Sequence, residues 1–215
     1  MIAVLTCDII ASRTYSDAQR QVLDADLRLA FRDSCMAIPQ AKADYLSFSV
    51  IQGDEFQFSL EAPRYFYRFL LMFRNRLALS SIEPMPCFRA GIGFGSRSIV
   101  GDNSYQMDGS AYHHARSAMN SFSQANFKNR LSAVVHEKQT LTNALNTMLA
   151  FCDSIEQGWT LTQRNAIAHA FTQGNSRQIA AILQVSRQNV DKLLKSAQWE
   201  LISQAMDYFE NVTGK

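Results

Sequence analysis

Residues 176–196 read Ser-Arg-Gln-Ile-Ala-Ala-Ile-Leu-Gln-Val-Ser-Arg-Gln-Asn-Val-Asp-Lys-Leu-Leu-Lys-Ser. Ser176 and Ser186 each precede an amphipathic stretch, and serine is a favoured residue at the N-cap of a helix. The stretch therefore predicts two short helices joined by a tight turn over residues 184–186. Ala180 is small enough to lie where the two helices cross. The apolar contacts between the helices are expected from Ile179, Leu183, Val185, Val190 and Leu193.

The sequence on either side of this pair supports the same interpretation. A further helix is predicted from Leu161 to Phe171, and Gln173-Gly174-Asn175 breaks the chain before the next cap. Gln184 stands where many such turns carry glycine, and other residues adopt the left-handed backbone of that turn at some cost. The layout of residues 160–199 resembles the helix-turn-helix of LuxR-type regulators and of region four of sigma factors.

The charge of the chain is concentrated on the same segment. Residues 161–199 carry five basic residues and one acidic residue, whereas the whole chain has a net charge of only +2. In this interpretation the helix after Ser186 lies in the major groove of DNA. Arg, Gln and Asn side chains read base edges, and other basic side chains neutralise phosphates. The predicted DNA-binding residues are Arg177, Ser186, Arg187, Gln188, Asn189, Lys192 and Lys195.

Two further expectations concern the C-terminal part. A bundle of helices that only packs or dimerises is the alternative to a DNA-binding module, and Asp191 counts slightly against a face made for phosphates. The tail at 199–209 carries an apolar stripe that suits either packing or a dimer contact. A homodimer is expected because one small module buries too little surface for tight, specific DNA binding.

The first 135 residues alternate strand-like and helix-like segments. Strands are predicted at 2–10, 45–51, 55–60, 87–94 and 131–135, and helices at 16–36, 65–79 and 109–119. The order β-α-β-β-α-β is the ferredoxin-like arrangement. The predicted class is therefore α+β, with a ferredoxin-like domain at 1–137, a connecting helix or linker at 138–158 and an all-α helix-turn-helix domain at 159–215.

Two aspartates stand out in the first domain. Asp8 ends the first strand, and Asp54 lies at the tip of a predicted hairpin in Gly53-Asp54-Glu55-Phe56. The first and third strands of a β-α-β-β sheet are neighbours, so their ends bring Asp8 and Asp54 together. Two close carboxylates repel each other unless a cation or a proton relieves them, which makes the pair a candidate Mg²⁺ site. Arg13 and Arg116 are candidates to hold a phosphate.

The same two positions resemble the metal-binding aspartates of class III nucleotide cyclases. The Gly-Asp-Glu-Phe turn is also similar to that of the diguanylate cyclase palm. Residues 89–95, Arg-Ala-Gly-Ile-Gly-Phe-Gly, and residues 108–116, Asp-Gly-Ser-Ala-Tyr-His-His-Ala-Arg, resemble two further cyclase segments. The resemblance implies a cyclase-like or palm-like fold and a small nucleotide-like ligand.

Three positions depart from the cyclase pattern. Tyr112 replaces the Asn of the cyclase Asn–Arg pair, Val50 replaces a purine-reading Lys, and Gln106 falls near an adenine-reading Asp. Recognition of a cyclase substrate is therefore unexplained, and the resemblance supports the fold better than catalysis. Whether the chain is an enzyme is left open, with the balance against it.

Several short motifs together resemble the SatD family. The motifs are Asp8-Ile-Ile-Ala-Ser-Arg13, Gly53-Asp-Glu-Phe-Gln57, Arg89-Ala-Gly-Ile-Gly93, Asp108-Gly-Ser-Ala-Tyr112 and Ala115-Arg116, followed by Lys195 to Trp199 after the predicted helix-turn-helix. The likeness implies the same two-part fold and adds little about mechanism.

The remaining features bound the class of protein. No apolar run approaches the ~18 residues that a membrane span needs, and we expect the first residues to form a strand and not a signal peptide. The four scattered cysteines favour neither a zinc site nor disulfides.

We therefore expect a cytoplasmic DNA-binding transcriptional regulator with a degenerate cyclase-like domain for sensing or dimerisation. The alternatives are a Mg²⁺-dependent nucleotide-binding or nucleotide-processing enzyme and a non-catalytic protein-interaction module.

Overall fold

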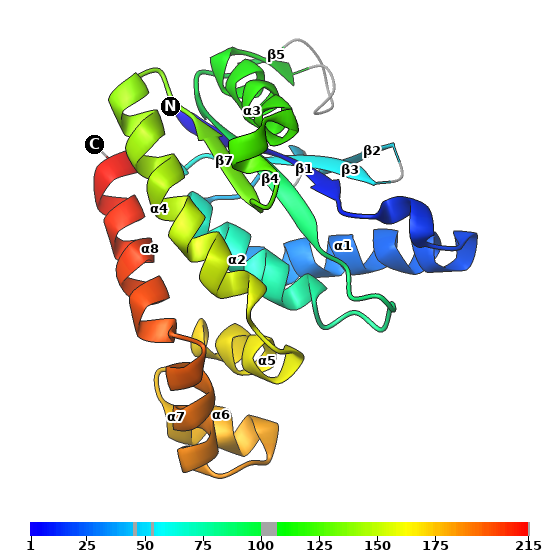
Figure 1. Ribbon diagram of the computed structural model, residues 1–215, viewed down its shortest axis with the longest axis vertical. Helices are drawn as coiled ribbons and strands as arrows, with labels where there is room; N and C mark the ends of the chain where they lie inside the picture. Colours follow the sequence, from blue (N-terminus) through cyan, green and yellow to red (C-terminus); the bar gives the residue numbers. More distant parts are fainter. Residues whose placement is uncertain (45–46, 53, 100–106, 215) are drawn as a thin grey trace.

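The computed structural model describes residues 1–44, 47–52, 54–99 and 107–214. Gly53, Gln106 and the start of the strand expected at 45–51 lie outside the described residues. The described part is a mixed α+β structure with one five-stranded sheet, and most of its regular residues are helical (Figure 1). Within it, no helix combines the length and the apolar character needed to cross a lipid bilayer.

The five-stranded sheet has the order β2-β3-β1-β4-β7. Its strands are β1 (Ile2–Ile9), β2 (Ser49–Gln52), β3 (Glu55–Leu60), β4 (Phe88–Gly95) and β7 (Ser132–Val135). The first and third strands are neighbours, as the sequence predicted, and β7 pairs with β4 in parallel while the other pairs are antiparallel. Two more short strands, β5 (Ser98–Ile99) and β6 (Met107–Asp108), pair in the interval between the strand predicted at 87–94 and the helix predicted at 109–119.

Helices cover both faces of this sheet. The described helices are α1 (Asp17–Ala37), α2 (Phe66–Leu77), α3 (Ser110–Asn120), α4 (Gln139–Gln157), α5 (Leu161–Ala170), α6 (Ser176–Leu183), α7 (Arg187–Ser196) and α8 (Trp199–Thr213). In Figure 1, α1 and α2 lie below the sheet and α3 lies above it, while α5 to α7 form the lower end of the molecule. Ser16 begins α1 with a capping box to Gln19.

Strand β1 is buried on both faces because it lies in the middle of the sheet. Alternate residues of a strand point to opposite faces. Leu5 and Cys7 belong to the large core that includes the phenylalanines of β3 and α2. Ile2 and Val4 belong to a second cluster beneath α3. The continuous apolar run at the N-terminus is therefore a central strand.

Helix α3 lies unusually close to β4, and three glycines make this approach possible. A Cβ atom at Gly93 would overlap the backbone of Ala111 and Ala115, and one at Gly91 would overlap Ala115 and Met119. The third, Gly95, faces the start of α3 in the same way. The alternation of Gly91, Gly93 and Gly95 thus decides how α3 sits on the sheet.

We expect Gly93→Ala to destabilise the protein by about 1–3 kcal/mol, because α3 must move to admit the methyl group. The measurement is the free energy of unfolding in urea. Gly174→Ala is the matched control, since a Cβ atom there meets nothing within 4 Å. Equal stability of the two variants would contradict the close packing of α3.

Helix α4 closes the β7 edge of the sheet with side chains instead of a sixth strand. The Asn146 amide accepts from the Val134 N–H (3.0 Å) and donates to the Val134 carbonyl (2.8 Å). Thr142 bonds the N–H and the carbonyl of His136 in the same way. The Asp153 carboxylate accepts the N–H groups of Leu131 and Ser132, both at 2.9 Å. The segment predicted as a connecting helix therefore covers an edge that would otherwise expose unpaired backbone groups.

Asn146→Ala is expected to cost about 1–3 kcal/mol of unfolding free energy, because it leaves the Val134 backbone groups of the edge unpaired. Asn143→Ala, on the exposed side of the same helix, provides the control. Thermal or urea unfolding measures the difference. If both variants unfold like the wild type, the amide is not needed to close the edge.

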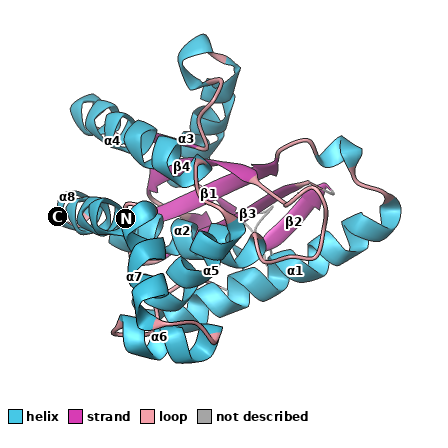
Figure 2. Cartoon of the chain, turned by 60° about the horizontal axis from the view of Figure 1, so that its bottom comes forward, coloured by secondary structure: helices cyan, strands magenta, loops and turns pink. Residues whose placement is uncertain are grey.

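The apolar stripe of α8 packs mainly against residues 1–137, the part of the chain that contains the five-stranded sheet and is called the sheet domain below. The ring of Phe209 lies 5.3 Å from Phe66 and 4.8 Å from Tyr67. Ile202 and Met206 are buried in the same core. Helix α4 precedes α5 to α7 in the chain and packs on β7, and α8 follows them and packs on α2 and α4 (Figure 2). The segment of α5 to α7 is therefore anchored at both its N-terminal and its C-terminal end.

Candidate functional site

The ends of α6 and α7 follow the sequence signals with one correction. Ser186 caps α7, its hydroxyl accepting from the Asn189 N–H. Ser176 does not cap α6; Asn175 does, and its side chain accepts from the N–H groups of Arg177 and Gln178. Asparagine is at least as good an N-cap as serine, so the helix begins one residue earlier than predicted, at Ser176. Gln184 has φ 55° and ψ 40°, the left-handed conformation expected of this turn.

Helices α6 and α7 share a small core. Ile179, Ala180 and Val190 are buried together, with Ala170, Leu183 and Leu194 packed against them. Ala180 lies within the cluster, in agreement with the predicted crossing. Val185 is 36% exposed and Leu193 lies outside the cluster, so two of the five predicted contacts are absent there. Leu194 contributes in their place because the helix turns that side toward α6.

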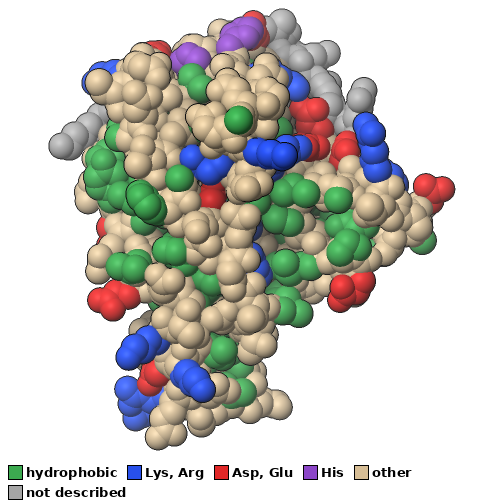
Figure 3. Space-filling model, viewed as in Figure 1, with side chains coloured by type: hydrophobic (Ala, Val, Ile, Leu, Met, Phe, Trp, Pro, Cys, Tyr) green, Lys and Arg blue, Asp and Glu red, His purple; other side chains and the backbone are tan. Residues whose placement is uncertain are grey.

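The outer face of α7 is open to solvent. Val190 is the one buried residue of this helix, and all of its described neighbours on the outer side are exposed. The exposed residues are Arg187, Gln188, Asn189, Asp191, Lys192 and Lys195. Figure 3 shows Lys and Arg side chains gathered over the lower end formed by α6 and α7. Asp191 pairs with Arg187 at 3.5 Å, so the acidic residue is partly neutralised within the helix.

A hollow lies where the starts of α6 and α7 meet. Asn175, Ser176, Arg177 and Arg187 line this open space of about 370 Å³. Helix N-termini favour anions, and the two guanidinium groups add positive charge. The structure thus brings Arg177 and Arg187, predicted on separate helices, to one opening.

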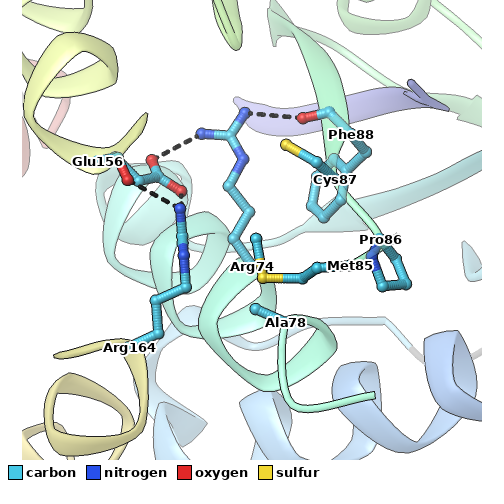
Figure 4. A pocket seen from close by; sticks show the side chains of 8 residues that line it. All are labelled: Arg74, Ala78, Met85, Pro86, Cys87, Phe88, Glu156 and Arg164. Atoms are coloured by element: carbon cyan, nitrogen blue, oxygen red, sulfur yellow. Dashed lines mark hydrogen bonds and ion pairs between the residues drawn. The ribbon is translucent and has the colours of Figure 1, made fainter. Parts of the chain in front are cut away.

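Arg164, one of the five basic residues in the C-terminal segment, points the other way. Its side chain is 6% exposed and donates to the backbone carbonyl of Glu156 at 2.8 Å. Arg74 of α2 reaches the same Glu156 from the opposite side, with Nη1 3.1 Å from Oε2. In Figure 4 both guanidinium groups converge on Glu156 beside a cavity of about 10 Å³.

This buried cluster joins four elements. Arg74 also donates to the carbonyl of Leu131 before β7, and Asp153 of α4 accepts from Ser132. Burial raises the pKa of Asp153, while the charge of Arg74 acts in the opposite direction. The arginines and carboxylates therefore compensate one another in a region that water does not reach. Sequence reasoning missed the cluster because its members are far apart in the chain.

Asp8 and Asp54 lie at the same end of the sheet, where β1 ends and β3 begins. Asp8 stands opposite Glu55 in the β1–β3 ladder, and the Ile9 N–H donates to the Asp54 carbonyl at 2.9 Å. The Ser12 hydroxyl donates to the Asp54 carboxylate. Arg13 follows on the same short connection and is exposed.

Asp8 and Glu55, the acidic side chains at this end of the strands on the face that α3 covers, each have an arginine partner. Arg89 donates to Asp8 at 2.7 Å, and Arg116 donates to Glu55 at 2.9 Å. Arg89 opens β4 directly opposite Asp8, so the strand register could have revealed this pair. Arg116, predicted to hold a phosphate, is 56% exposed at its side chain.

The arrangement does not suit a tightly held Mg²⁺ ion. A cation at Asp8 would have to displace the Arg89 guanidinium from its carboxylate. Among the residues that the structure describes, no group of three His, Cys, Asp or Glu side chains could hold a metal ion. Asp8 and Asp54 as a cation site therefore stay a prediction that the local ion pairs do not favour.

Replacing Arg89 tests whether the guanidinium takes the place of a metal ion. In Arg89→Gln, Asp8 loses its partner, and we expect about 10 mM Mg²⁺ to raise Tm more than in the wild type, because bound ligand stabilises the native state. Arg68→Gln is the control, since it breaks ion pairs with Asp207 and Glu210 elsewhere. A variant that responds to Mg²⁺ like the wild type would argue against any cation site at Asp8 and Asp54.

Comparison with known proteins adds one match. The model of the SatD family matches residues 1–207, nearly the whole chain. No curated protein matches the sequence. The match confirms the resemblance that the short motifs indicated.

Proposed function

The chain belongs to the SatD family, and we propose that it is a DNA-binding transcriptional regulator. In this proposal α6 and α7 are a helix-turn-helix, and α7 enters the major groove of DNA. The sheet domain is a ferredoxin-like, cyclase-related domain that has lost catalysis and serves in sensing or dimerisation. The observation that carries the proposal is the outer face of α7, which is exposed and rich in side chains of the kinds that read DNA.

The roles of the residues follow from their positions. Arg187, Gln188 and Asn189 form the first turn of α7, whose N-terminal residues contact base edges in such motifs. Lys192 and Lys195 lie farther along the helix, where they reach phosphates. Arg177 shares its opening with Arg187, so it contacts the backbone beside the groove. Ser186 holds the helix start, and its hydroxyl is available at the same end.

The exposed charge of α6 and α7 supports the assignment, although it includes one basic residue fewer than the sequence count. Arg164 is withdrawn into the buried cluster, and what remains outside is four basic residues against the single Asp191. Asp191 itself lies beside Arg187. A solvated face that served only for packing would more usually mix both signs of charge.

The sheet domain supports ligand binding better than catalysis. The strand order β4-β1-β3-β2, with β7 added at the β4 side, supports the proposed ferredoxin-like arrangement. Arg116 and Arg13 lie near the end of the sheet that carries Asp8 and Asp54. We propose that these two arginines bind the phosphate of a small nucleotide-like ligand. The metal-binding role of Asp8 in cyclases is not available while Arg89 neutralises it.

The DNA-binding role predicts separable effects of two kinds of variant. On a random duplex of about 30 base pairs, Lys192→Ala and Arg177→Ala should weaken binding and lower the salt slope by about 1 each, since each removes one phosphate contact. Arg187→Ala and Asn189→Ala should instead cost about 1–3 kcal/mol for the sequence selected from a random library. Fluorescence anisotropy at ~50 and ~200 mM salt measures both.

Lys128→Ala is the matched control, because Lys128 is exposed in the sheet domain. Affinity that is unchanged in all four variants, or wild-type binding that does not respond to salt, would overturn the assignment of α7. Binding of ATP or GTP with turnover that Asp54→Ala abolishes would favour an enzyme instead.

A further inference from the structure

A second hollow lies beside the proposed DNA-binding helix, at the corner where α7 meets α8. It has a volume of about 480 Å³ and is lined by Leu194, Lys195, Gln198, Trp199, Glu200 and Leu201. Gln198 has φ 54°, so the backbone turns sharply between the two helices. The corner is therefore concave, and its floor is largely apolar.

An apolar side chain stands at the rim of this hollow. Leu201 is 53% exposed, whereas its neighbour Ile202 is fully buried on the inner side of α8. Two turns farther along, Tyr208 lies on the same outer side and is 38% exposed. Figure 3 shows hydrophobic side chains over the α4 and α8 side of the molecule, where Phe151 of α4 is 67% exposed. Exposed apolar side chains gathered in this way mark an interaction surface.

The charges at the corner have opposite signs. Lys195 ends α7 and Glu200 begins α8, and both are exposed at the hollow. Across a two-fold axis the same surface meets itself, so residue i of one copy contacts residue j of the other, and j contacts i. In such a contact Lys195 of each copy would face Glu200 of the other and each Leu201 would enter the opposite hollow, so Lys192 would be the lysine of α7 left for phosphates. The corner thus carries both a hollow and an exposed apolar side chain, and both a positive and a negative charge.

We infer that the α7–α8 corner, lined by Leu194, Trp199 and Leu201, is the surface through which two copies of this chain form a dimer. This inference rests on the proposed function, because reading two half-sites of DNA requires a second copy of the chain as the partner. Two recognition helices read successive half-sites when they lie about 34–36 Å apart. A two-fold contact next to α7 keeps the two helices close enough for this spacing.

One other apolar stripe is exposed on the described surface of a long helix. Val22, Leu29 and Met36 of α1 are 41%, 45% and 64% exposed at intervals of seven residues. Figure 1 places α1 well away from α7, so a dimer through α1 leaves the recognition helices far apart. The opposite charges beside this stripe already pair within α1, as Arg28 does with Asp24, so the stripe provides a matched control.

Sedimentation velocity of the full-length chain without DNA tests the surface. We expect the wild type to be a dimer, and Leu201→Glu to raise the dissociation constant at least ~10-fold, as the loss of a central contact does. Leu29→Glu should stay dimeric. Thermal unfolding of both variants checks that an exposed position has been changed without loss of the fold.

Charge reversal gives a second, independent readout. Glu200→Lys should weaken the dimer, and the double variant Lys195→Glu with Glu200→Lys should restore it, because the pair is rebuilt across the axis. A wild type that is monomeric with and without DNA, a Leu201→Glu variant that remains dimeric, or loss of the dimer in Leu29→Glu would each overturn the inference. If a monomer binds DNA, the dimer inference is wrong and the proposed function stands. If the protein is a dimer that binds no DNA, the proposed function is wrong and the dimer inference stands.

Discussion

The buried contact between Arg74 and Glu156 is the constraint around which the molecule is arranged. A guanidinium that is only 3% exposed must have a carboxylate and hydrogen-bond acceptors, since an unpaired charge in such a place costs several kcal/mol. Arg74 finds them on α4, before β7 and on β4. Because Glu156 also holds Arg164 of α5, the same contact fixes the first helix of the C-terminal group.

This contact makes the C-terminal helices part of the body of the protein. The Trp159 indole donates to the Ala197 carbonyl at 2.8 Å, joining the start of α5 to the end of α7. Helix α8 then returns to pack Phe209 on the sheet domain. The direction in which α7 faces is therefore set by the sheet domain, and a ligand that altered α7 would have to act through α4, α5 or α8.

At the end of β1, an arginine stands beside an acidic side chain where a metal ion was considered. The acidic positions resemble those of nucleotide cyclases, yet Arg89 and Arg116 occupy the places beside them. An arginine neutralises a carboxylate without offering the coordination chemistry of a metal ion. Arg13, which is exposed on the connection after β1, adds positive charge at the same end of the strands.

The sequence by itself determined the elements that depend on neighbours in the chain. The caps at Ser16 and Ser186, the left-handed turn at Gln184 and the strands at 2–10 and 55–60 all follow from local backbone preferences and apolar alternation. The pairing of the first and third strands followed from the order of elements. The exposed face of α7 was foreseen for the same reason, since helical periodicity separates Val190 from its charged neighbours.

Only the tertiary structure decided which charges meet. Arg164 and Arg187 look alike in the sequence, but one is buried against Glu156 and the other faces solvent. Asn146 and Asp153 close the sheet edge, and Arg89 neutralises Asp8, through contacts between residues distant in the chain. The physical reason is that helix and strand propensities act over a few residues, whereas the partner of a buried charge is set by packing.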